Sequence, residues 1–192
     1  MRKSIYLFLF LASTLFLPSC SYNSLVSYDE AAKKAWADVE AAYQRRNDLI
    51  GNLVETVKGE AKFEKETLTA VVEARAKATS IQLKADDITP ENMAKFQEAQ
   101  SQLSGALSRL LAVAEAYPNL KATEAFQSLM NELERTENRI NIARRDYNEA
   151  VQVYNTKVRS FPSNITAGLF KFKQREPFKA DPGSEKAPKV QF

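Results

Sequence analysis

Charged and amide side chains with the potential to bind a ligand gather in two short stretches that lie far apart in the sequence. They are Arg45, Arg46, Asp48, Glu137, Asn138, Arg144 and Arg145. Guanidinium groups bind carboxylates and phosphates through paired hydrogen bonds, so a site for a partner or ligand is one interpretation. The preferred interpretation is structural, because polar residues in a helix seam fix helix register when they are paired.

The sequence lacks the side chains on which most catalytic and metal sites depend. It contains no histidine, the side chain that most often serves as a general base or a transition-metal ligand. Glu64, Glu66 and Glu73 could suggest paired catalytic acids, but a solvated helix face explains them better. We therefore expect no catalytic residue, no metal and no cofactor, and we predict that the chain is not an enzyme.

The N-terminal segment has the features of a bacterial secretion signal. Arg2 and Lys3 precede the apolar run Ile5–Leu17, which is short for a transmembrane helix. The next residues, Pro18-Ser19-Cys20, complete a resemblance to the lipobox of bacterial lipoproteins, and Cys20 is the only cysteine. We expect residues 1–19 to be a signal peptide, Cys20 to carry the lipid, such as palmitate, and residues 20–27 to be a lipidated linker. The alternative is an uncleaved anchor with an incidental thiol.

This anchor would place the chain in the bacterial cell envelope, facing the periplasm. Ser21 follows the lipidated cysteine, and by resemblance to lipoprotein sorting signals it slightly favours the outer membrane. The net charge is only +3, without the clustered basic face that nucleic-acid binding requires. The expected partners are therefore a membrane and an unidentified envelope protein, and no nucleic acid.

Apolar residues repeat three and four positions apart in four segments, at residues 28–58, 60–84, 90–117 and 123–160. This spacing is typical of helices that pack in a coiled-coil-like manner. We predict an all-α, antiparallel, up-and-down four-helix bundle over residues 28–161. Gly59 favours a turn between the first two helices, and one long kinked helix is the alternative. Thr89 and Pro90 are expected to cap and begin the third helix.

The predicted packing brings charged residues of two seams to one level. Arg46 interrupts the apolar seam of the first helix, and Glu137 and Arg144 interrupt that of the last. If these helices run antiparallel from the turn at Gly59, Arg46 and Glu137 share a layer. A lone buried charge is costly, whereas a paired one is tolerable. We therefore predict a contact between Arg46 and Glu137 inside the dry seam, with Arg144 nearby.

Asparagines and aromatic residues near the C-terminus supply two further expectations. Asn141, Asn148 and Asn155 repeat every seven residues, so they could form a hydrogen-bonding ridge for a partner or, preferably, satisfy local groups. Residues 162–178 are expected to pack on the bundle through Phe170 and Phe172, and residues 179–192 to be a flexible tail. Contact of the basic, aromatic stretch from Leu169 to Phe192 with anionic lipid is the alternative.

Several stretches of the sequence resemble the LemA family. They are Tyr22-Asn23-Ser24-Leu25-Val26, Ala35-Trp36-Ala37-Asp38-Val39, Arg45 through Gly59, Tyr117-Pro118-Asn119-Leu120-Lys121, Glu137-Asn138-Arg139-Ile140, Arg144 through Asn148, Val153-Tyr154-Asn155 and Phe161-Pro162-Ser163-Asn164. Gly51 stands where most relatives have proline. The resemblance implies a helical bundle tethered to a membrane by its N-terminus, without catalytic residues, and often a partner of envelope systems or membrane proteases.

These observations together predict a non-catalytic, membrane-anchored envelope protein that presents a helical bundle as an interaction surface. The alternative is a bundle that binds a small molecule in its buried Arg/Glu layer. A self-assembling structural protein is a further possibility, and it would show apolar surface stripes after the bundle has packed.

Overall fold

The computed structural model describes the backbone of residues 2–60 and 63–179, and the side chains of residues 21–60 and 63–179. The expected signal peptide and the side chain of Cys20 therefore lie outside the residues with described side chains. All of the expected flexible tail except Lys179 also lies outside the described part.

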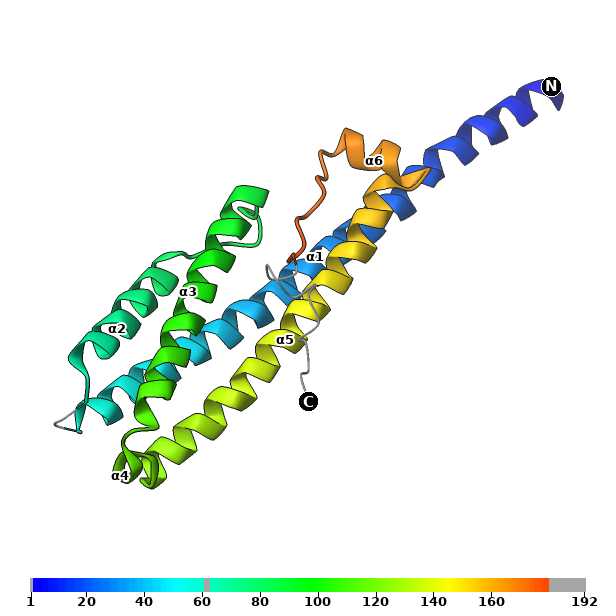
Figure 1. Ribbon diagram of the computed structural model, residues 1–192. Coiled ribbons are helices and arrows are strands. Elements are labelled where there is room, and N and C mark those ends of the chain that lie inside the picture. The colour runs from blue at the N-terminus through cyan, green and yellow to red at the C-terminus, as the bar shows by residue number, and fades with distance from the viewer. Residues whose placement is uncertain (1, 61–62, 180–192) are drawn as a thin grey trace, which may run out of the picture.

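The described part of the chain is helical. Its elements are α1 (Arg2–Lys58), α2 (Lys65–Ser80), α3 (Pro90–Ala114), α4 (Pro118–Lys121), α5 (Glu124–Arg159) and α6 (Ser163–Leu169). The four long helices α1, α2, α3 and α5 follow one another in alternating directions (Figure 1). α1 lies along α5, and α2 packs against α3. The prediction of an all-helical protein is confirmed.

Local sequence signals mark several helix ends. The Thr89 hydroxyl accepts a hydrogen bond of 3.2 Å from the Asn92 amide, and Pro90 is the first residue of α3. The Thr123 hydroxyl caps α5 in the same way, through the Phe126 amide. Such caps satisfy amide groups that the helix leaves without partners. The predictions for Thr89 and Pro90 are confirmed.

The turn predicted near Gly59 is present, and the predicted start of the first helix needs a correction. α1 ends at Lys58 and α2 begins at Lys65, so the two are separate, and the alternative of one long kinked helix is wrong. α1 also continues N-terminally beyond the predicted start at residue 28, so the described residues 21–27 are helical. The reason is that Leu25 is fully buried against Tyr154 and Val158 of α5, which extends the apolar seam upward.

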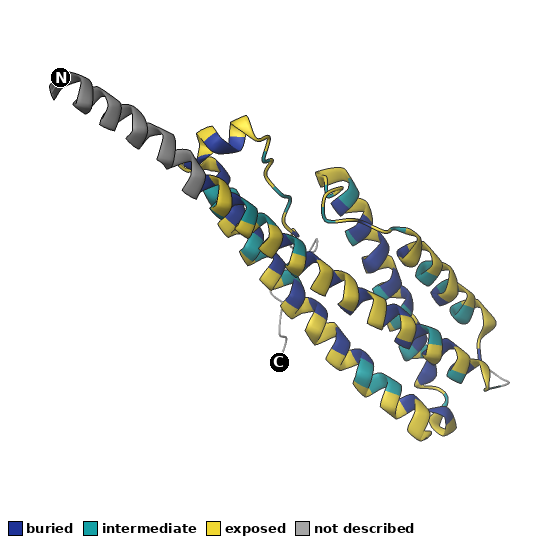
Figure 2. Ribbon diagram, turned by 180° about the vertical axis from the view of Figure 1, so that it is seen from behind, coloured by how far each residue is buried: buried dark blue, intermediate teal, exposed yellow. Residues whose placement is uncertain are grey.

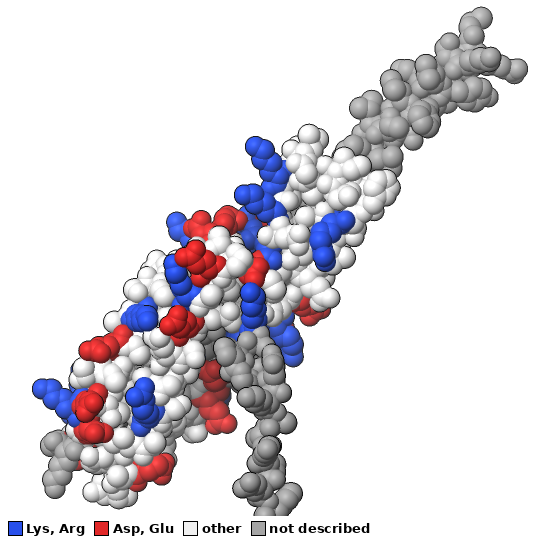
Figure 3. Space-filling model, turned by 45° about the horizontal axis from the view of Figure 1, so that its top comes forward, with Lys and Arg blue, Asp and Glu red and all other residues white. Residues whose placement is uncertain are grey.

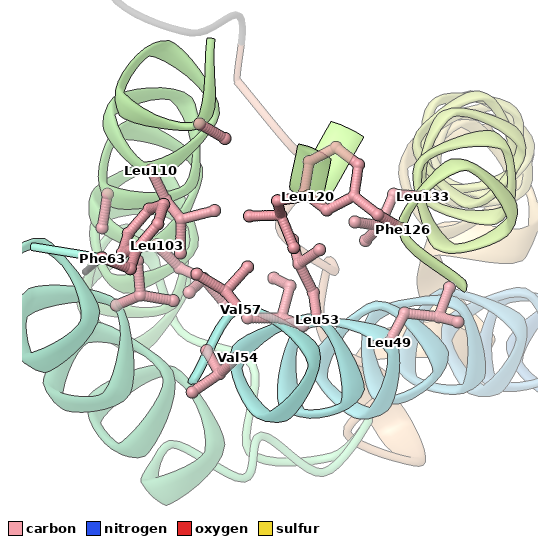
Figure 4. Close-up of a cluster of buried hydrophobic side chains, with 14 of the residues drawn as sticks. Leu49, Leu53, Val54, Val57, Phe63, Leu103, Leu110, Leu120, Phe126 and Leu133 are labelled. Carbon is pink, nitrogen blue, oxygen red and sulfur yellow. The ribbon is translucent and has the colours of Figure 1, made fainter. Parts of the chain in front are cut away.

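The core lies in stripes where the helices face one another, shown as the buried residues in Figure 2. At the α4 end, side chains from five helices and the segment after α1 meet in one cluster, including Leu53, Val57, Leu103, Leu110 and Phe126 (Figure 4). Burying one such side chain contributes about 1.5–3 kcal/mol. A second cluster surrounds Trp36 in the middle of the bundle. Buried side chains thus join α1 and α5 along most of the length over which they pack.

The chain folds back after α5. α6 packs against both α1 and α5, and Lys171, with φ of 60°, lies between this helix and the segment that returns down the bundle. Residues 171–179, named the strap below, then run beside α5 without helical structure (Figure 1). The strap brings C-terminal residues next to the middle of the bundle.

Candidate functional site

Arg46 forms the centre of a polar layer between α1, α3 and α5. Its Nη1 donates to Glu137 Oε2 at 3.2 Å and to Ser104 Oγ at 3.2 Å. Its Nη2 donates to Gln100 Oε1 at 2.5 Å, and its guanidinium lies 5.0 Å from the Tyr43 ring centroid. The Arg46–Glu137 contact is the one that the register of the seams predicts.

The two charges of this layer are not equally buried. Arg46 is 4% exposed, whereas the Glu137 side chain is 52% exposed. The expectation that both charges lie in a dry seam is therefore wrong for Glu137. The neutral side chains of Gln100 and Ser104 accept hydrogen bonds from the Arg46 guanidinium. A partly hydrated carboxylate avoids much of the desolvation cost of a fully buried ion pair.

A polar hollow of about 260 Å³ opens beside this layer. Arg46, Gln100, Glu137 and Arg144 all line it, so Arg144 lies near the pair as predicted. Within the described part of the chain, Arg46 Nε is buried without a hydrogen-bond partner. A buried donor without a partner is costly, so the Nε–H group of Arg46 is a donor that could still bind a partner within this layer.

The other predicted site residues do not join this layer. Arg45 pairs with Glu132 at 2.7 Å, and Arg145 contacts Asp146 at 3.4 Å, in both cases on the surface. Asp48 and Asn138 are also exposed. The seven residues therefore separate into one layer, formed by Arg46, Glu137 and Arg144, and four surface positions.

The strap is held to α5 by two asparagines, a role that sequence reasoning missed. Asn148 donates to the Phe178 carbonyl at 3.1 Å and accepts from the Phe178 amide at 2.8 Å. Asn155 makes the same pair of hydrogen bonds with Arg175, both at 2.8 Å. Asn141, one heptad below Asn148, is exposed. Two of the three regularly spaced asparagines thus bind backbone from a distant segment instead of local groups.

Phe178 is the apolar anchor of the strap. It is 6% exposed, and its ring stacks on Trp36 with centroids 5.7 Å apart and an interplanar angle of 23°. The Trp36 indole nitrogen donates to the Leu83 carbonyl at 2.7 Å, which joins the loop after α2 to the same cluster. Phe172 is partly buried near Leu25, and Phe170, although half-exposed, packs its ring on Tyr22 of α1 with centroids 4.7 Å apart, so both side chains dock on the bundle as expected.

The Arg175 side chain connects the strap to two other parts of the chain, α1 and the loop after α2. Its Nε donates to Asp29 of α1 at 2.8 Å, its Nη1 donates to the Ala85 carbonyl at 2.5 Å, and its Nη2 donates to Asp86 at 3.1 Å. The hydrogen bond from Arg175 holds the pKa of the Asp86 carboxyl below its usual value. Burial alone would lower the pKa of Arg175, but the bonds to Asp29 and Asp86 more than offset it and raise that pKa.

Two buried tyrosines of α5 also hold the strap. The Tyr147 hydroxyl donates to the Glu176 carbonyl at 3.0 Å, and the Tyr154 hydroxyl donates to the Lys173 carbonyl at 2.9 Å. Burial raises the pKa of each phenol to about 12. Both hydroxyls therefore remain protonated donors at neutral pH, and they bind and orient the strap.

The described side chains offer no arrangement that points to metal chemistry. Among them, no three Cys, Asp or Glu side chains lie close enough together to hold a metal ion. Within the same residues, no helix combines the length and the apolar character needed to cross a bilayer.

Comparison with known proteins identifies relatives of this chain. The curated relatives include the magnetosome protein MamQ 2 of Paramagnetospirillum magneticum, 27% identical, and the magnetosome protein MamQ of Magnetospirillum gryphiswaldense, 24% identical. Each match covers 85% of this chain and 66% of the relative, just under two thirds of its length. The protein LemA of Metamycoplasma hominis is 27% identical over 76% of this chain and 63% of its own length. The profile of the LemA family matches residues 35–192, so the chain belongs to the LemA family.

Proposed function

We propose that this chain is a non-catalytic protein of the bacterial envelope, held at a membrane by its N-terminal segment, which presents a four-helix bundle to other proteins. The observation that carries the proposal is the continuity of α1 (Arg2–Lys58), which runs without a break from Cys20, the expected lipid site, into the bundle. An anchor at its N-terminal end would therefore be joined directly to the bundle, without a flexible linker. Tethering raises the local concentration of the presented surface at the membrane.

The relatives support a membrane setting for this proposal. Two of them are named as magnetosome proteins and one as LemA, and we extend to this chain only a location at a bacterial membrane. The finer part of the proposal is a lipid on Cys20, a bundle that faces the periplasm and a slight preference for the outer membrane. The lipobox-like residues before Cys20 support this part.

The outer face of the α1–α5 pair is the best candidate for the presented surface. A shallow hollow of about 320 Å³ runs between the two helices on this face, with Ala35, Ala42 and Ala143 in it and charged residues such as Arg45 at its rim. Ile142 in the same hollow is 43% exposed. Small residues permit another helix to approach closely, and an apolar floor with a polar rim is typical of protein interfaces.

A small anionic ligand in the polar hollow is the second candidate function. The specific observation in its favour is the buried Arg46 Nε, which lacks a partner and belongs to a side chain that lines the hollow. A carboxylate beside Arg46 and Arg144 would satisfy such a donor. Calorimetric titration with small carboxylates, with Arg46→Met as the control, would detect this binding.

In-cell photocrosslinking tests the main proposal. A photoreactive residue at Ile142 should give a specific adduct with an envelope protein, and the same residue at Val72, equally exposed on α2, should not. The absence of any adduct at Ile142, or the same adducts at both sites, would contradict presentation by this face. Separately, labelling with a palmitate analogue should mark the chain and should be lost in Cys20→Ala. Label that persists in Cys20→Ala would refute the lipid anchor.

A further inference from the structure

The end of the bundle near α6 carries a stripe of exposed apolar side chains. Phe161, Ile165 and Leu169 are 81%, 65% and 74% exposed, and they are spaced four residues apart. Ile165 and Leu169 lie four residues apart in α6 and therefore share one side of that helix, and Phe161 lies in the turn that precedes it. Single exposed apolar residues are ordinary, but a continuous exposed patch marks an interaction surface.

This stripe lies at the end of the bundle from which the N-terminal part of α1 leaves (Figure 1). The Tyr22 ring of α1 packs against Phe170, with centroids 4.7 Å apart, and against Phe172, at 5.8 Å. Contacts among Tyr22, Phe170 and Phe172 thus connect the apolar stripe to the N-terminal part of α1, which would lead to the anchor. Tyrosine and other aromatic side chains favour the boundary between lipid and water.

The charges around the stripe have one sign. The sequence has no Asp or Glu between Glu149 and Glu176, and this stretch contains Lys157, Arg159, Lys171, Lys173 and Arg175. Residues 21–28 of α1, which pass beside α6, carry no charged side chain. In Figure 3 the surface next to the grey N-terminal segment is white and blue, and the Asp and Glu side chains begin farther along the bundle.

The Arg175 side chain forms salt bridges with Asp29 and Asp86 within the protein, so it does not contribute a free charge to this surface. The other basic residues of this stretch remain to surround the apolar stripe, and Arg159, Lys171 and Lys173 are exposed. Lysine and arginine can extend their charged ends toward lipid headgroups while their alkyl stems stay near the apolar boundary. Anionic lipid attracts such clusters, and this attraction weakens as salt rises.

We propose that this surface, named the α6 face and formed by Phe161, Ile165, Leu169 and Phe170 with the surrounding lysines, rests on an anionic phospholipid bilayer. This surface makes a second membrane contact in addition to the N-terminal anchor, so the inference depends on the proposed function. Apolar residues flanked by basic ones are the pattern of segments that bind in the membrane interface. Two contacts fix the orientation of the bundle, whereas the anchor alone would leave it free to swing.

Lipid photocrosslinking tests this proposal on the full chain, incorporated into vesicles of phosphatidylethanolamine and phosphatidylglycerol. Benzoylphenylalanine placed at Phe161 or Leu169 should form adducts with lipid, which mass spectrometry identifies. The same group at Val72 or Ile142, which are exposed but far from the α6 face, should not. In vesicles of phosphatidylcholine alone, and at high salt, the yield at Phe161 and Leu169 should fall several-fold.

Flotation of the same samples separates failure of the α6 face from failure of the anchor. If the chain floats with the vesicles but Phe161 and Leu169 give no more lipid adduct than Val72, the α6 face proposal is wrong and anchoring stands. If the chain does not float, the proposed membrane tethering itself fails. Adducts to a second copy of the chain in place of lipid would also overturn the proposal. The double variant Ile165→Asn with Leu169→Asn should retain the fold, as checked by circular dichroism, and lose the adduct at Phe161.

Discussion

Replacing Phe178 with alanine gives the sharpest test of how the strap is held. The ring centroid of Phe178 lies 5.7 Å from that of Trp36, 5.6 Å from that of Tyr147 and 6.5 Å from that of Phe96. Removal of a buried phenylalanine ring costs about 3–5 kcal/mol in a closed core. The strap packs on one side of the bundle and can detach without unfolding the helices, so we expect the lower end, about 3 kcal/mol.

Trp36 provides the assay, because it is the only tryptophan in the chain and stacks directly on Phe178. In Phe178→Ala we expect Trp36 emission to shift to longer wavelength as water reaches the indole. A loss of about 3 kcal/mol should also lower the midpoint of thermal unfolding by roughly 6–12 °C for a chain of this size.

The matched control is Phe161→Ala, because Phe161 is 81% exposed. Away from membranes, this substitution should change the free energy of unfolding by no more than about 0.5 kcal/mol and leave Trp36 emission unchanged. If Phe178→Ala behaves like Phe161→Ala in both measurements, the strap does not cover Trp36 and the reasoning is refuted.

Three further predictions follow from the same contacts. Asn148→Ala should lower the free energy of unfolding by about 1–3 kcal/mol, because it leaves the backbone groups of Phe178 without their partners. Asn141→Ala is the control and should be near neutral in denaturant titration. Equal effects of the two substitutions would contradict the role of Asn148 in holding the strap. Glu137→Gln should cost less than about 1 kcal/mol because the carboxylate is half-exposed, and a loss above that of Arg46→Ala would show that the layer is organised differently. The raised pKa of Tyr147, about 12, means that its stabilising effect is complete below the phenol's unfolded pKa of about 10 and is lost as the pH rises through about 12. The thermal midpoint should fall over that range, and Tyr147→Phe should reduce the fall.

Much of the helical framework could be predicted because it depends on periodic side chains. The three-and-four spacing identifies the long helices, and counting from the turn near Gly59 places Arg46 level with Glu137. The same count cannot say how deeply a side chain lies, because a seam position at the edge of two helices is open to water. This is why Glu137 is half-exposed although it was expected to be dry.

The strap could not be predicted in the same way. It is extended and has no helical period, and Asn148 and Asn155 recognise its backbone, which leaves no signature in its side chains. The Arg175 side chain binds partners from two segments, α1 and the loop after α2, whose proximity depends on the whole fold. Two features of the sequence did point to these sites. The asparagines that repeat every seven residues indicated a hydrogen-bonding role on α5, and the absence of acidic residues in the stretches 21–28 and 150–175 indicated the α6 face.

The height of the bundle above the membrane tests the central claim of a helical bundle held upright at its N-terminal end. From Tyr22 to Lys58, α1 rises roughly 54 Å at 1.5 Å per residue, and Asn119 of α4 lies at the far end (Figure 1). Energy transfer would be measured from a dye at Asn119 or at Ile165 of α6 to acceptors in the lipid headgroups of vesicles that carry the full chain. We expect strong transfer from Ile165 and little from Asn119. Equal transfer from both positions would mean that the bundle lies flat, and transfer from neither would mean that it is not held at the membrane; either result would contradict the account.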